Sequence, residues 1–130
     1  AGAFAVICVA GARPITAPGP LVTGVPAIVR GCRKHGVRKL LVQASSLSVV
    51  PGERWGWLTP GRLARSVEKY QNGNNTLEDS DRVIRYLYEE VRDLDWIVSR
   101  PPGLIDGDRK GPLSPCFDPH RPQCLRYLDL

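Results

Sequence analysis

The sequence predicts an α/β fold built on a parallel, three-layer sheet. Two short runs, residues 3–10 and 39–46, are almost continuously apolar, and the second turns polar at its C-terminal end. Such runs are typical of strands that are buried on both faces. The segment between them has helical periodicity. A strand, a helix and a strand within about 45 residues form a βαβ unit, and a second helix and a third strand follow.

The first helix is predicted by one apolar face, made by Val25, Ile28, Val29 and Cys32. Thr23 has the side chain of a helix N-cap, and Pro26 is tolerated in the first turn that this cap would begin. Gly36 stands where a glycine ends a helix. These signals predict a helix that begins after Thr23 and ends before Gly36.

The second helix is predicted to begin at residues 76–79, which resemble a capping box with Asp79 in place of the usual glutamate. Its apolar face is made by Ile84, Leu87, Tyr88 and Val91. A third strand at residues 95–100 is stopped by Pro101 and Pro102.

Turn signals divide the chain into a partial Rossmann-like domain at residues 1–107 and a proline-rich tail at 108–130. Six of the twelve prolines lie from residue 101 onward. Residues 47–75 read as a long irregular connection, and a short strand is expected within 125–128. A chain of this length that starts without Met and carries half of such a domain is expected to be a fragment.

Composition narrows the function classes. No apolar run reaches the roughly 18 residues that a membrane span needs, so we expect no membrane partner and a cytoplasmic protein, with an organelle such as a plastid as the alternative. Cys8 and Cys32 fall at apolar positions and are expected to be reduced and buried. The four cysteines lack a tight Cys-x-x-Cys pair, and we expect no metal.

The net charge of +5 permits anionic partners without selecting one. Six basic side chains cluster near the end of the first helix: Arg30, Arg33, Lys34, His35, Arg38 and Lys39. The cluster spans a helix end and a strand start and has no interleaved aromatic residue. We therefore rank nucleic-acid binding below binding of a small anionic ligand.

Ligands of open α/β sheets bind outside the carboxyl ends of the strands. Three segments fall there: residues 11–13 (Gly-Ala-Arg), 44–46 (Ala-Ser-Ser) and 100–104 (Arg-Pro-Pro-Gly-Leu). The first has little side-chain bulk at its start, the second projects hydroxyl groups, and the third offers Pro-Gly backbone to a flat ring. Together they predict a ligand site at this edge.

Three segments resemble the atypical short-chain dehydrogenase/reductases that bind NAD(P)H, in particular the NmrA-like and biliverdin-reductase-B (flavin reductase) group. They read AFAVICVAGAR, GVPAIVRGCRKHGVRKLLVQASS and LEDSDRVIRYLYEEVRDLDWIVSRPPGLIDG. The likeness covers residues 3–107 and corresponds to the C-terminal half of the family's domain.

The resemblance implies roles for particular residues. Those implied to contact the cofactor are Gly11, Ala12, Arg13, Ser45, Ser46, Pro101, Pro102, Gly103 and Leu104. Ser45 would lie near the nicotinamide and the substrate, and Arg82 would orient an anionic group; these two are the catalytic candidates. Trp55 and Trp57 would cover a flat substrate.

Two features of the family are absent. The sequence has no glycine-rich phosphate loop and no Tyr-x-x-x-Lys pair, and Tyr88, four residues before Arg92, is expected in the core. One hypothesis is a fragment of an NAD(P)H-dependent oxidoreductase that acts on a flavin, tetrapyrrole, quinone or similar planar acceptor. The other is a non-catalytic NAD(P)-sensing or protein-interaction module of the NmrA-like type.

The strand at residues 3–10 would be central in the related fold. Without the first half of that fold, one of its edges is bare, which predicts self-association through this strand.

Overall fold

The computed structural model describes residues 2–11, 19–45, 47–52, 63–64, 67, 75–101, 104–105 and 125–126. Their main body is a three-stranded parallel sheet in the order β1-β2-β3. Its strands are β1 (Ala5–Cys8), β2 (Lys39–Gln43) and β3 (Asp95–Ser99). The predicted α/β class and the parallel sheet are therefore confirmed.

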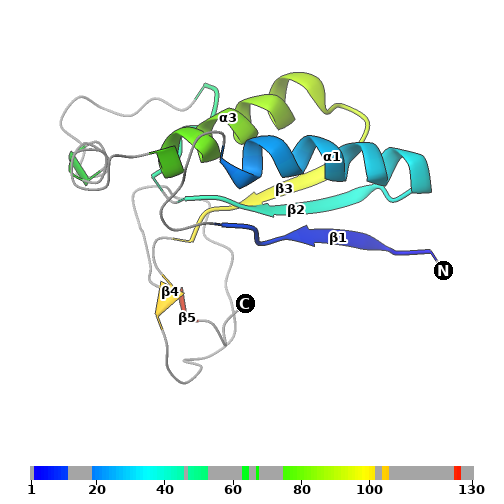
Figure 1. The fold of residues 1–130 in the computed structure, drawn as a ribbon, viewed down its shortest axis with the longest axis horizontal. Coiled ribbons are helices and arrows are strands. Elements are labelled where there is room, and N and C mark those ends of the chain that lie inside the picture. The colour runs from blue at the N-terminus through cyan, green and yellow to red at the C-terminus, as the bar shows by residue number, and fades with distance from the viewer. Residues whose placement is uncertain are drawn as a thin grey trace.

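Two of the described helices connect these strands: α1 (Pro20–His35) lies between β1 and β2, and α3 (Asn75–Glu90) lies between β2 and β3. Both lie on the same side of the sheet (Figure 1), so the described elements form two layers. A separate parallel pair joins β4 (Leu104–Ile105) to β5 (Leu125–Arg126). The strand expected within residues 125–128 is thus present, whereas β4 was not predicted.

The core lies between the sheet and the two helices. Every second strand residue faces the helices: Val6, Leu40 and Trp96 form one row across the sheet, and Cys8, Val42 and Val98 form the next. The helices contribute the fully buried side chains of Val25, Val29, Val83 and Leu87. Each such side chain stabilises the fold by about 1.5–3 kcal/mol relative to an exposed one.

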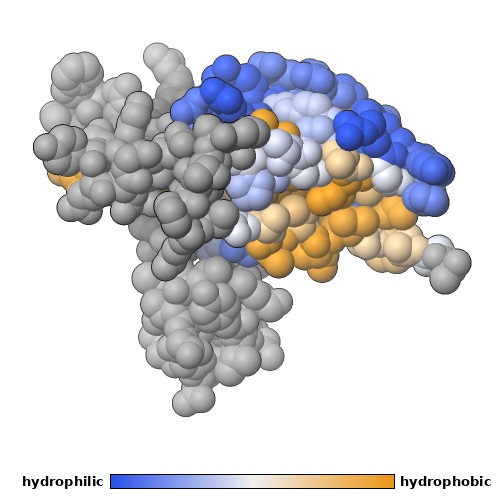
Figure 2. All heavy atoms as spheres, in the orientation of Figure 1, coloured by the Kyte–Doolittle hydropathy of each residue, from blue (hydrophilic) through white to orange (hydrophobic). Residues whose placement is uncertain are grey.

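The opposite face of the sheet is open. Ile7, Leu41 and Ile97 form a row across the three strands, and Ile7 is 68% exposed and Ile97 66% exposed. Figure 2 shows hydrophobic residues gathered along the sheet, apart from the hydrophilic outer surface of the helices. The prediction of burial on both faces is therefore wrong for β1 within the described part of the chain, whereas Leu41 of β2 is partly buried on this face.

Helix α1 ends as predicted but begins earlier. Gly36 caps its C-terminus with a left-handed φ of 68°, a conformation that costs glycine nothing sterically. Its first residue is Pro20, whose fixed φ suits this position, and Gly19 is the N-cap. Thr23 is therefore not the cap; its hydroxyl donates a hydrogen bond to the Gly19 carbonyl oxygen at 3.2 Å.

The cap that Gly19 cannot supply comes from the other helix. One carboxylate oxygen of Asp79 accepts a hydrogen bond from the Leu21 amide at 3.0 Å, and the other accepts one from the Val22 amide at 2.9 Å. Asp79 is only 3% exposed. The capping-box pattern assigned Asp79 to the start of its own helix, whereas the structure shows it capping α1. A Cβ atom on Gly19 would overlap the Asp79 carboxyl group, so glycine is needed there.

Helix α3 begins at Asn75 and buries most of the predicted face. Ile84, Leu87 and Val91 are buried, but Tyr88 is 45% exposed. Its ring lies 5.9 Å from the Arg92 guanidinium, so the interpretation of Tyr88 as a core residue is wrong. Val83 is buried in the core on this helix.

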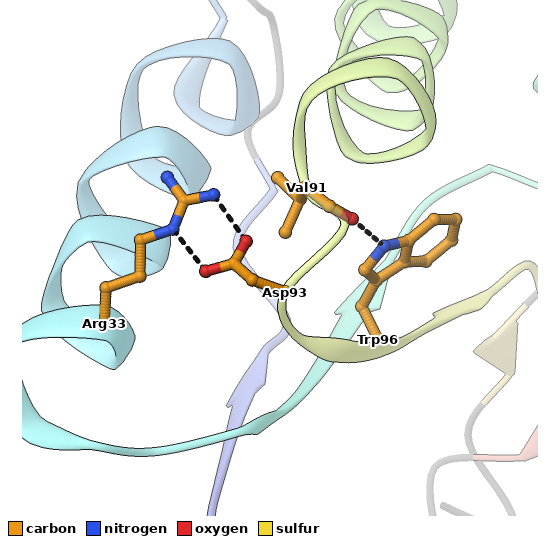
Figure 3. A network of polar contacts seen from close by, with 4 residues as sticks. All are labelled: Arg33, Val91, Asp93 and Trp96. Atoms are coloured by element: carbon orange, nitrogen blue, oxygen red, sulfur yellow. Dashed lines mark hydrogen bonds and ion pairs between the residues drawn. The ribbon is translucent and has the colours of Figure 1, made fainter.

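A second contact joins the far ends of the helices (Figure 3). Asp93, which follows α3, accepts hydrogen bonds from Nε and Nη2 of Arg33 at 2.8 and 2.7 Å. Beside it, the Trp96 indole donates to the Val91 carbonyl oxygen at 2.9 Å. The hydrogen bond with Arg33 holds the pKa of Asp93 below its usual value and raises the pKa of Arg33.

Two other expectations concern cysteines and membranes. Cys8 and Cys32 are free and buried, as predicted, whereas Cys116 and Cys124 lie outside the described residues. Among the described helices, none is long and apolar enough to span a bilayer.

We expect Asp79→Ala to lower the free energy of unfolding by about 1.5–3 kcal/mol, because it leaves two amides of the first turn of α1 without an acceptor. Urea denaturation followed by circular dichroism measures the change. Glu78→Ala is the control, because Glu78 is exposed and loses only its ion pair with Arg82, worth less than about 1 kcal/mol. Equal losses in the two variants would refute the cap.

We expect Asp93→Asn to lower the urea midpoint more at pH 7 than at pH 3. A carboxyl group whose pKa is lowered by folding stabilises the protein above its unfolded pKa of about 3.9, and that contribution is lost as the pH falls through the lowered folded value. Glu90→Gln removes an exposed carboxylate that has no ion pair among the described residues, and is the control. A difference between wild type and Asp93→Asn that is the same at both pH values contradicts the assignment.

Candidate functional site

The carboxyl ends of the three parallel strands meet at one edge of the sheet. Gly11 follows β1, Ser45 follows β2, and Arg100 follows β3. The Ala44 amide donates a hydrogen bond to the Ser99 carbonyl oxygen at 2.8 Å, which continues the β2–β3 pairing beyond the end of β2. The structure therefore brings Ser45 and Arg100 to neighbouring positions.

Ser45 begins a tight turn. Its hydroxyl oxygen accepts a hydrogen bond from the Leu47 amide at 3.2 Å, and its carbonyl oxygen accepts one from the Ser48 amide at 3.0 Å. The Ser48 hydroxyl, fully buried, donates to the same carbonyl oxygen. The Ser45 side chain is half-buried, and within the described part of the chain no acceptor is found for its proton. Ser45 can therefore donate a hydrogen bond to a ligand.

Arg100 and Asp81 hold this turn from two sides. Nη1 of Arg100 donates to the Ser48 carbonyl oxygen at 3.0 Å, and Oδ1 of Asp81 on α3 accepts from the Val49 amide at 2.8 Å. The Arg100 side chain is half-buried and places a positive charge at the sheet edge. An arginine in this position can attract an anionic group.

Sequence reasoning placed Arg100 at this edge but gave it no role, and it missed Asp81 and Ser48. The signal for Arg100 was its place as the first residue after a predicted strand. No local pattern could reveal the contact between Asp81 and Val49, because it joins residues 32 positions apart.

Arg82 lies on the outer surface of α3. It forms an ion pair with Glu78, one turn earlier, and both side chains are more than half exposed. This is the environment of a solvated helix arginine, and the pair contributes little to stability. Its role as a site residue stays a prediction.

The other predicted site residues fall into two groups. Gly11 is exposed, Pro101 is buried, and Leu104 belongs to β4, where it pairs with Leu125. The remaining ones lie outside the described residues: Ala12, Arg13, Ser46, Trp55, Trp57, Pro102 and Gly103.

The helix N-terminus next to this edge is already occupied by a carboxylate. Helix N-termini bind phosphate through free amides and a positive dipole. In α1 the Leu21 and Val22 amides donate to Asp79, whose negative charge would also repel a phosphate. The start of α1 is therefore closed to a dinucleotide's pyrophosphate, in agreement with the missing phosphate loop.

Among the described residues, no three His, Cys, Asp or Glu side chains gather as metal ligands would. The chain matches no family model, no curated protein and no solved structure.

We expect Asp81→Ala to speed hydrogen exchange of the Val49 amide about tenfold, because a charged acceptor contributes roughly 1.5 kcal/mol to keeping that amide closed. Exchange monitored by NMR measures this directly. The Ala44 amide, bonded to the Ser99 carbonyl oxygen, is the internal control and should keep its rate. Unchanged exchange at Val49 would show that Asp81 does not hold the turn.

Proposed function

We propose that this chain binds NAD(P)H through the nicotinamide side of a Rossmann-like sheet, as part of an oxidoreductase that reduces a flavin, tetrapyrrole, quinone or similar planar acceptor. The observation that carries the proposal is that Ser45 and Arg100 both contact one turn, at residues 45–48, at the carboxyl edge of a parallel sheet. Ligands of open α/β sheets bind at this edge.

The donors at the edge suit part of a dinucleotide. The Ser45 hydroxyl suits a carboxamide or ribose oxygen, and the Arg100 guanidinium suits a phosphate or an anionic substrate. When bound, the cofactor would supply the hydride, and the protein would supply only orientation and exclusion of water. Because Asp79 closes the start of α1, the proposal assigns no pyrophosphate contact to that helix.

A second candidate function is dinucleotide sensing without turnover. It is favoured by the side chains at the described edge, because a guanidinium such as that of Arg100 is suited to binding anions, and no described base contacts the Ser45 hydroxyl. Tyr88, which has Arg92 at the spacing of a catalytic pair, instead stacks on it at the end of α3. Such an edge fits binding better than proton transfer.

We expect NADPH to change the fluorescence of the three tryptophans with a dissociation constant below about 1 mM, in the range of ordinary cofactor sites. Ser45→Ala should weaken binding about 3- to 10-fold, the effect of one lost hydrogen bond. Arg82→Gln tests the predicted contact of Arg82 with an anionic group, and Arg85→Gln, another exposed arginine on α3, is its matched control. Absence of a saturable signal overturns the proposal.

Turnover separates the two candidates. Steady-state oxidation of NADPH with flavin or quinone acceptors supports the oxidoreductase, whereas saturable binding without oxidation supports the sensor.

A further inference from the structure

Strand β1 is an edge of the described sheet. Its inner side pairs with β2 from Ala5 to Cys8, and no described strand pairs with its outer side. The outward-facing amide and carbonyl groups of an edge strand form a ready template for another strand.

Two of the usual protections against such pairing, charged residues and proline, are missing from this edge. Residues 2–11 contain no charged residue and no proline. The opposite edge differs, because β3 begins with Asp95 and is followed by Arg100 and Pro101. Charges and prolines are what proteins use to keep edge strands from pairing, so the two edges of this sheet are not equivalent.

We propose that β1 pairs antiparallel with β1 of a second copy of this chain, around a two-fold axis at Ile7. The three-stranded sheets then join into one sheet of six strands. This assigns a symmetric partner and a register to the edge that the described strands leave unpaired.

The register follows from the open face. Ile7, Leu41 and Ile97 already form one row across three strands. With Ile7 opposite Ile7 of the second copy, this row continues across all six strands. The open faces of the two sheets then lie on the same side of the joined sheet, and so do the faces that the helices cover. Ala5 then lies opposite Val9, and Phe4 opposite Ala10, so a small side chain meets a larger one in each pair.

The edge itself favours a second copy as the occupant. An uncharged segment offers no charge by which an acidic or basic partner strand could be selected, whereas a two-fold axis satisfies both bare edges at once. The outer edges of the six-stranded sheet are then the two β3 strands, which carry Asp95, Arg100 and Pro101. Assembly therefore stops at the dimer.

Sedimentation velocity of the purified 130-residue chain over a wide concentration range tests the proposal. We expect a reversible monomer–dimer equilibrium, which Ile7→Lys weakens at least about tenfold by placing two like charges opposite each other on the axis. Ile97→Lys is the matched control, because Ile97 has the same side chain, the same face and nearly the same exposure (66% against 68%) on the other edge. It should leave the dimer intact.

The other outcomes each overturn the proposal. A monomer at every concentration does so, as does a dimer that Ile7→Lys leaves unchanged. Loss of the dimer in both variants would instead indicate stacking of the open faces. Circular dichroism checks that the variants fold.

Disulfide cross-linking tests the proposed register of the two β1 strands independently. Ile7→Cys should form a disulfide-linked dimer on mild oxidation, because directly opposed residues of antiparallel strands lie about 4.5–5.5 Å apart at Cα, within the range for a disulfide. The unmodified chain and Ile97→Cys, oxidised in parallel, report the background from the native cysteines. A trapped dimer of Ile7→Cys no more abundant than this background refutes the register.

Discussion

The buried carboxylate of Asp79 is the contact from which much of the described structure follows. It accepts hydrogen bonds from the first turn of α1 and thereby fixes where that helix begins and how α3 lies against it. Two residues further along α3, Asp81 reaches the Val49 amide and positions the turn that starts at Ser45. The start of α3 thus contacts both the first turn of α1 and the turn at the carboxyl edge of the sheet.

The helices were the part of the fold best predicted from the sequence, because the periodicity of apolar residues reports which side of a helix is buried. Val25, Val29 and Cys32 on α1 and Ile84, Leu87 and Val91 on α3 are buried as that periodicity requires. Tyr88 is at the margin of the same face, where the pattern does not distinguish a core position from one that covers a neighbouring arginine.

The strands show a different limit of prediction from sequence. A continuous apolar run predicts two buried faces, but it carries no information about what buries the second. The described elements cover one face of β1 and leave Ile7 exposed. The start of α1 was misplaced for a related reason, since a capping side chain 60 residues away from Gly19 leaves no local sequence signal.

For the candidate site, the order of strands and helices was enough to predict that Gly11, Ser45 and Arg100 would meet at one edge. The hydrogen bonds of Arg100 and Asp81 to the turn at residues 45–49 were not predictable, since they depend on how β3 and α3 pack.

The contact between Gly19 and Asp79 also has an evolutionary consequence. Because no side chain fits at position 19 while an aspartate occupies position 79, position 19 can gain a side chain only where position 79 has changed. Homologues with a Ser, Asp or Asn cap at position 19 should carry a smaller residue at 79, and this covariation would mark lineages in which α1 caps itself.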